Sequence, residues 1–203
     1  DDNQISAFCP GAMARPCRRI PQGLLGKKTI GIIAPGNLSD MLAYAGQYRR
    51  TKTRYFFDPG QQTTILNGSQ FRKCLNGAYG FISNDYELSL ALKKTGWTFA
   101  RLLQTVTIVV TTLGAKGSRI FTAGKKVIIP PAKPKNSSDP TGAGDAYRAG
   151  FVKGLQLGLP LEQCGRLGAV VSVYSVETYG TQTHQFTWKD IKKRYYRNFK
   201  ERL

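Results

Sequence analysis

The stretch Asp139-Pro140-Thr141-Gly142-Ala143-Gly144-Asp145 is a glycine-rich turn that runs directly into a helix-like segment, 146–154. Glycine has no Cβ, so its backbone can adopt unusual dihedral angles and can approach a ligand closely. The first N–H groups of a helix have no partner within it, and they lie at the positive end of the helix dipole. Residues 142–145 are therefore predicted to form an anion site that suits a phosphate.

Asp145 follows the glycines and lies at the mouth of this predicted site. A carboxylate there could take a proton from an attacking hydroxyl group, and an anion site beside a base is what phosphoryl transfer to an alcohol requires. Aspartate also commonly caps helices, and such a turn also serves as an ordinary strand-to-helix connection. These residues alone leave both interpretations open.

Two upstream segments accompany this stretch: Asn84-Asp85-Tyr86-Glu87 and Thr112-Leu113-Gly114-Ala115-Lys116-Gly117-Ser118. In order and spacing, they and the 139–152 segment resemble the N-x-x-E motif, the T-L-G-x-x-G loop and the signature of the PfkB (ribokinase-like) family of sugar and nucleoside kinases. Residues 2–13 resemble a mid-chain segment of bacterial members related to adenosine kinase. The resemblance runs to about Tyr196, and the N-terminal third of the family is absent.

The resemblance implies an enzyme that uses ATP and Mg²⁺ to phosphorylate a primary hydroxyl group of a nucleoside or sugar, such as the 5′-hydroxyl of adenosine. Asp145 would be the general base, and Gly142, Ala143 and Gly144 would form the anion hole with the Asp145 N–H. Asn84 and Glu87 would organise Mg²⁺ and phosphate through bound water. Without the resemblance, Glu87 would be an ordinary acid near a helix start.

Further roles follow from the same resemblance. The nucleotide of ATP is expected at Thr112, Gly114 and Gly117, although these residues could also form a plain turn. A monovalent cation such as K⁺ is expected beside the anion hole, at Asp139, Thr141 and Gly180. Contact with the acceptor substrate is expected at Asn3, Gln4 and Phe8.

Two more side chains lie near these motifs. His184 is expected either close to the nucleotide or in a structural position. Arg148, one helical turn beyond Asp145, is expected on the helix surface, with contact to a phosphate as the alternative.

The alternation of strand and helix patterns predicts a parallel sheet with helices on its faces. Asn84 and Thr112 each follow a strand, so both are expected at one crevice. The predicted fold is a ribokinase-like three-layer α/β/α domain over 1–203, without the lid and first strands. The predicted strands are 29–34, 54–58, 78–83 and 105–111, with a hairpin at 118–122 and 125–130. The predicted helices are 37–49, 69–75, 85–94, 161–179 and 187–202.

The absent part of the family supplies the first strand, most of the lid and a glycine pair that helps to hold the acceptor. The sheet is therefore expected to expose an edge, and the acceptor pocket to be half built. Three explanations stay open: a portion of a longer chain, a missing piece that is a separate chain, or a degenerate relative that serves as a scaffold. The lids of the family often mediate dimers, so a homodimer is a further expectation.

Composition narrows the class of protein. Hydrophobic residues make up 41% of the chain, which excludes wholesale disorder, and no run is apolar enough to span a bilayer. Four cysteines without a C-x-x-C pair and a single histidine argue against a zinc site. Free thiols are typical of a reducing compartment, either the cytoplasm or an organellar matrix.

The net charge is the unusual property, because 30 Lys and Arg against 12 Asp and Glu give a formal +18. Such a charge attracts polyanions. The alternative to the kinase is therefore a catalytically silent scaffold bound to RNA or to a nucleoprotein assembly. A solvated basic surface without such a partner explains the charge equally well.

Overall fold

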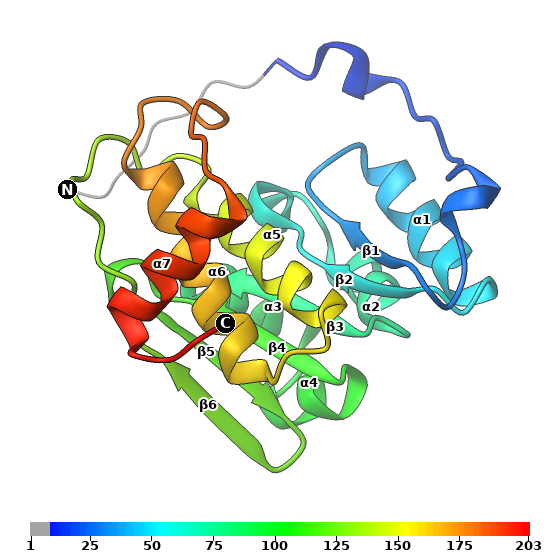
Figure 1. The fold of residues 1–203 in the computed structure, drawn as a ribbon. Coiled ribbons are helices and arrows are strands. Elements are labelled where there is room, and N and C mark those ends of the chain that lie inside the picture. Colours follow the sequence, from blue (N-terminus) through cyan, green and yellow to red (C-terminus); the bar gives the residue numbers. More distant parts are fainter. Residues whose placement is uncertain (1–8) are drawn as a thin grey trace.

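The computed structural model describes residues 9–203, and Figure 1 shows one sheet between two layers of helices. Four parallel strands stand in chain order: β1 (Ile30–Ile33), β2 (Arg54–Phe57), β3 (Gly80–Asn84) and β4 (Ile108–Thr112). An antiparallel hairpin of β5 (Ser118–Thr122) and β6 (Lys125–Ile129) extends the sheet beyond β4. The predicted mostly parallel sheet is confirmed. Among the described residues β1 pairs on one side only, so the expected open edge is present.

The helices form two groups, one on each face of the sheet (Figure 1). One group consists of α1 (Leu38–Arg50), α2 (Gly68–Leu75), α3 (Asp85–Thr95) and α4 (Phe99–Thr105). The other consists of α5 (Ala143–Gln156), α6 (Leu161–Val176) and α7 (Trp188–Phe199). Short 3₁₀ turns occur at Gly11–Ala14, Gln22–Leu24, Gly60–Thr64 and Gly114–Lys116. None of the helices in 9–203 combines the length and the apolar character needed to cross a membrane.

Strand β2 explains why the sheet is covered on both faces. Tyr55 and Phe57 belong to the apolar cluster under α1–α4, whereas Phe56 belongs to the cluster under α5–α7. Successive side chains of a strand point to opposite faces, and all three of these rings are fully buried. A strand that is apolar at successive positions therefore requires helices on both sides, which is the three-layer arrangement.

Helices α5 and α6 approach each other through glycines. A Cβ on Gly150 would lie 2.9 Å from both the Gly168 Cα and the Leu167 carbonyl oxygen. One turn further along α5, a Cβ on Gly154 would lie 2.9 Å from the Cys164 Cα. The two backbones thus touch directly, and this contact sets where the N-terminus of α5 lies relative to the sheet.

Some element boundaries differ from the expectation. Helix α5 begins at Ala143 rather than 146, because Gly142 takes a left-handed conformation with φ +84° and the chain turns into the helix there. The strand expected from 105 begins at Ile108, since α4 occupies the residues before it. Helix α6 ends at Val176 rather than 179.

Candidate active site

The candidate site lies at the carboxyl ends of the parallel strands. Asp58 follows β2, Asn84 is the last residue of β3, and Thr112 is the last residue of β4. Asn84 and Thr112 are register partners, so they lie side by side as predicted. Ligands of parallel α/β proteins bind at this edge of the sheet. Asn3, Gln4 and Phe8 lie outside the described residues, so their assignment to the acceptor stays a prediction.

The glycine turn presents the start of α5 to open space. The positive φ of Gly142 favours glycine, and a Cβ there would lie 3.2 Å from the Thr181 Cβ. A Cβ on Gly144 would meet nothing within 4 Å among the described residues. The N–H groups of Gly144 and Asp145 belong to the first turn, so they have no acceptor within the helix. This arrangement fits the predicted anion hole at Gly144 and Asp145, whereas the Ala143 N–H donates to the Pro140 carbonyl oxygen at 3.1 Å.

Asp139 ties the turn to the loop after α6. Its Oδ1 accepts a hydrogen bond from the Thr141 N–H at 2.9 Å, and its Oδ2 accepts one from the Gly180 N–H at 3.0 Å. A hydrogen bond with the Thr141 side chain has the largest effect on the pKa of Asp139, and the two backbone N–H groups act in the same direction. Together they lower this pKa. The structure thus brings together the three residues expected to hold a monovalent cation. It also gives Asp139 a structural role, because its carboxylate fixes the turn to the loop after α6. Cation binding there stays a prediction.

Asn84 and Glu87 form a capping box at the start of α3. The Asn84 Oδ1 accepts from the Glu87 N–H at 2.7 Å, and the Glu87 Oε2 accepts from the Asn84 N–H at 2.9 Å. The same arrangement caps α2 through Asn67 and Gln70. The pattern is therefore sufficient to cap a helix. The Glu87 Oε1 has no hydrogen-bond partner within residues 9–203, so it can accept a bound water.

The loop after β4 contains two glycines with different roles. Gly117 has φ +85°, and a Cβ on it would lie 2.1 Å from the Ile129 carbonyl oxygen. Contact with β6 therefore explains this glycine. Gly114 has φ +55°, and a Cβ there would meet nothing within 4 Å in the part of the chain that the structure describes. Gly114 thus leaves open space at the end of β4, beside Thr112, where a nucleotide is expected.

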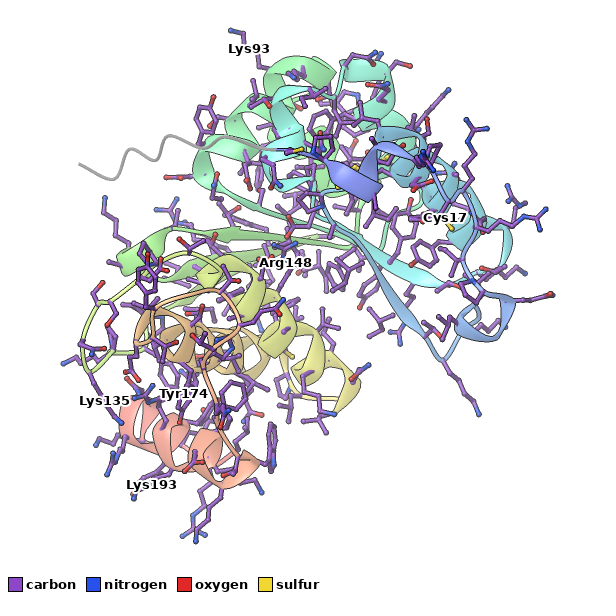
Figure 2. All side chains as sticks on the ribbon, turned by 90° about the horizontal axis from the view of Figure 1, so that it is seen from above. Cys17, Lys93, Lys135, Arg148, Tyr174 and Lys193 are labelled. Atoms are coloured by element: carbon purple, nitrogen blue, oxygen red, sulfur yellow. The ribbon has the colours of Figure 1, made fainter. Side chains whose placement is uncertain are left out.

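Arg148 corrects one expectation, because it lies inside the molecule and not on the helix surface. Its side chain is 11% exposed, and Figure 2 shows it in the middle of the molecule, between α5 and the strands. Its Nε lies 2.8 Å from the Asp58 Oδ2, and its Nη2 donates to the Asp145 Oδ1. Asp145 itself is 75% exposed, as a base that meets a substrate must be.

Asp58 is the residue that sequence reasoning missed. Its side chain is 5% exposed, and burial raises its pKa to about 7. The Arg148 guanidinium opposes this rise in pKa, whereas the carboxylates of Glu87 and Asp145 add to it. A signal was available, since Asp58 directly follows an apolar strand and precedes Pro59-Gly60. A carboxylate at the carboxyl end of a parallel strand is a typical site position.

Two cavities lie away from these residues, where the 133–138 loop meets α6 and α7. Their volumes are about 150 and 280 Å³, and both are lined by Lys135 and Tyr174. His184 lines the larger cavity and stacks on Phe186, with 5.8 Å between the ring centroids. Figure 2 labels Lys193, which lines the smaller cavity. Within 9–203, no three His, Cys, Asp or Glu side chains gather as a metal site.

Comparison with known proteins agrees with this geometry. Residues 27–188 match the model of the pfkB family carbohydrate kinases. A nucleoside kinase of Methanothermobacter thermautotrophicus is 33% identical over 188 residues, which are 91% of this chain and 60% of that protein. A nucleoside kinase of Methanocaldococcus jannaschii is 36% identical over 138 residues, which are 68% of this chain and 46% of that protein.

Solved structures extend the likeness to the whole chain. The Burkholderia thailandensis nucleoside kinase in complex with inosine has a TM-score of 0.91 and is 28% identical, with 100% of this chain and 68% of that chain covered. The same enzyme in complex with ADP-inosine has a TM-score of 0.90. By the coverages given above, the chain spans about half the length of the curated relatives that it matches. Since the family model covers most of the sequence, the chain belongs to the pfkB family of carbohydrate kinases.

Proposed function

We propose that the protein is an ATP-dependent nucleoside kinase and that this chain carries the part that transfers the phosphate. The observation that supports this most directly is the exposed carboxylate of Asp145, in the first turn of α5 beside Gly142 and Gly144. Relatives named nucleoside kinase favour a nucleoside over a free sugar as the acceptor. The argument for an RNA-bound scaffold is the charge of +18, and the relatives compared above are named as kinases.

The proposed step uses groups of this chain in two ways. Asp145 takes the proton of the nucleoside hydroxymethyl group as its oxygen attacks the γ-phosphorus of ATP. A bond forms between that oxygen and phosphorus, the bond from phosphorus to the β-phosphate oxygen breaks, and ADP leaves with the electron pair. The N–H groups of Gly144 and Asp145, in the first turn of α5, donate to the oxygens of the transferring phosphate and stabilise its charge.

The residues proposed to bind ATP lie at the same carboxyl-terminal edge of the sheet. Gly114 leaves room for the nucleotide at the end of β4, and Thr112 lies beside it. Glu87 fits a role toward Mg²⁺ through water, because its Oε2 caps α3 while its Oε1 has no hydrogen-bond partner among residues 9–203. When bound, Mg²⁺ would neutralise charge on the phosphates. Asp139, Thr141 and Gly180 remain the proposed place for K⁺, and the homodimer and the reducing compartment remain predictions.

The test measures ADP release by the native-length protein with ATP, Mg²⁺ and a panel of inosine, adenosine, cytidine, guanosine and ribose. We expect turnover that depends on a nucleoside, and we expect Asp145→Asn to lower kcat by about 100-fold or more. The folded state should persist in this variant, because the carboxylate is exposed.

Asp190→Asn is the matched control. Asp190 occupies the same position in the first turn of α7 that Asp145 occupies in α5, and it lies outside the candidate site. Its replacement should leave kcat unchanged. Equal turnover by wild type and Asp145→Asn would refute the assignment of the base. A folded native-length protein without turnover on any acceptor of the panel would refute the proposed activity.

A further inference from the structure

A buried ion pair lies directly behind the proposed base. Asp58 at the end of β2 and Arg148 on α5 are both nearly inaccessible to solvent, and 2.8 Å separates the Asp58 Oδ2 from the Arg148 Nε. The same guanidinium donates through Nη2 to the exposed Asp145. Arg148 thus links a buried carboxylate with an exposed one. The step proposed above gives neither Asp58 nor Arg148 a role.

Stability alone is a weak explanation for this pair. Removing two charges from water is costly, and apolar side chains of similar size often stabilise such a position as well or better. The surroundings add to the cost, because the carboxylates of Glu87 and Asp145 also disfavour a charge on Asp58. The pair is better explained by what it does to the direction of the Arg148 side chain.

The guanidinium group is planar and rigid, so the position of one nitrogen determines the direction of the others. The Asp58 Oδ2 contacts Nε as an ion pair without a hydrogen bond, and Nη2 donates a hydrogen bond to the Asp145 Oδ1. An exposed carboxylate without such a partner would exchange between rotamers in water. The other oxygen of Asp145, Oδ2, has no hydrogen-bond partner within residues 9–203.

We propose that Arg148 is a positioning residue for the base Asp145, and that Asp58 anchors Arg148 from the end of β2. Arg148 holds Oδ1, so Oδ2 is kept free and aimed for the proton of the acceptor hydroxyl. This inference rests on the proposed function of Asp145. It also predicts that lysine cannot replace Arg148, because a single ammonium group lacks the planar fork that holds two carboxylates in fixed directions.

The experiment measures kcat and the nucleoside KM of the native-length protein, expressed per folded molecule. The variants are Arg148→Lys, Arg148→Gln, Asp58→Asn and the double variant Asp58→Asn with Arg148→Gln. Each single variant should lower kcat by about 10- to 100-fold, because a small misplacement of a reacting group has effects of this size. The nucleoside KM should change by less than about 3-fold, since the proposed pair acts on the base and not on binding.

The double variant shows whether Asp58 acts through Arg148 or whether the two residues affect kcat independently. If Asp58 acts through Arg148, the double variant should have the same kcat as Arg148→Gln alone. The matched control is Glu162→Gln, which removes a carboxylate partner of Arg166 outside the site and should leave kcat unchanged. If Arg148→Gln does not fold, Arg148→Lys and Asp58→Asn still decide the outcome.

Three results would overturn the inference: a kcat within about 3-fold of wild type for the Arg148 variants, a loss that appears in KM alone, or multiplicative losses in the double variant. An inactive Asp145→Asn together with active Arg148 variants would refute this inference and leave the proposed function intact. An active Asp145→Asn, or a wild type without turnover, would refute both.

Discussion

Replacement of Gly150 by alanine tests whether the backbones of α5 and α6 are in direct contact. The added Cβ would lie 2.9 Å from three atoms, of which the Gly168 Cα and the Leu167 oxygen belong to the backbone. Backbone atoms cannot rotate away, so α5 and α6 must separate. Such overpacking costs about 3 kcal/mol, and the better helix propensity of alanine returns about 1 kcal/mol. We therefore expect a net destabilisation of about 2 kcal/mol, or a Tm lower by about 4–8 °C.

Gly46→Ala is the control for this experiment. Gly46 lies within α1, and among the described residues a Cβ there would meet only the flexible end of Arg50, at 3.4 Å. Helix propensity should then stabilise the protein by about 0.5–1 kcal/mol. Urea unfolding followed by far-ultraviolet circular dichroism measures both variants. Equal or greater stability of Gly150→Ala relative to wild type, alongside a stabilised Gly46→Ala, would refute the proposed contact.

Two further predictions concern buried titratable groups. The pKa of Asp58 is raised to about 7 in the folded protein, so the native state binds its proton more tightly than the unfolded chain does. As the pH rises from about 4 to about 7, the free energy of unfolding should therefore fall by about 1 kcal/mol per pH unit. Asp58→Asn should lack this slope in urea titrations at pH 5 and pH 8, and parallel pH dependences would contradict the assignment. Burial raises the pKa of Cys74 to about 12 and that of Cys164 to about 11, whereas Cys9 and Cys17 are exposed. Iodoacetamide at pH 8 should therefore modify two thiols in the native protein and four in urea, as counted by mass spectrometry; rapid native labelling of Cys74 would contradict this.

Much of the fold could be predicted because the buried strands are short apolar runs separated by helical patterns. Phe56 and its neighbours show this, since a strand apolar at successive positions requires helices on both faces. Boundaries were harder to predict. Helix α4 was missed because it is only 7 residues long, although Thr98 caps it as a local signal. The start of α5 was misplaced because it depends on the left-handed turn at Gly142.

The local chemistry of the site was determined by the sequence itself: a carboxylate after a glycine turn at the start of a helix, and side chains at strand ends. These features depend on neighbours in the chain, so motifs reveal them. Only the tertiary structure decided that Arg148 lies inside the molecule, between Asp58 and Asp145. That contact requires α5 to lie across the end of β2, and close glycine packing against α6 holds α5 there. Residues far apart in the chain meet through this packing, and no local pattern of side chains encodes their meeting.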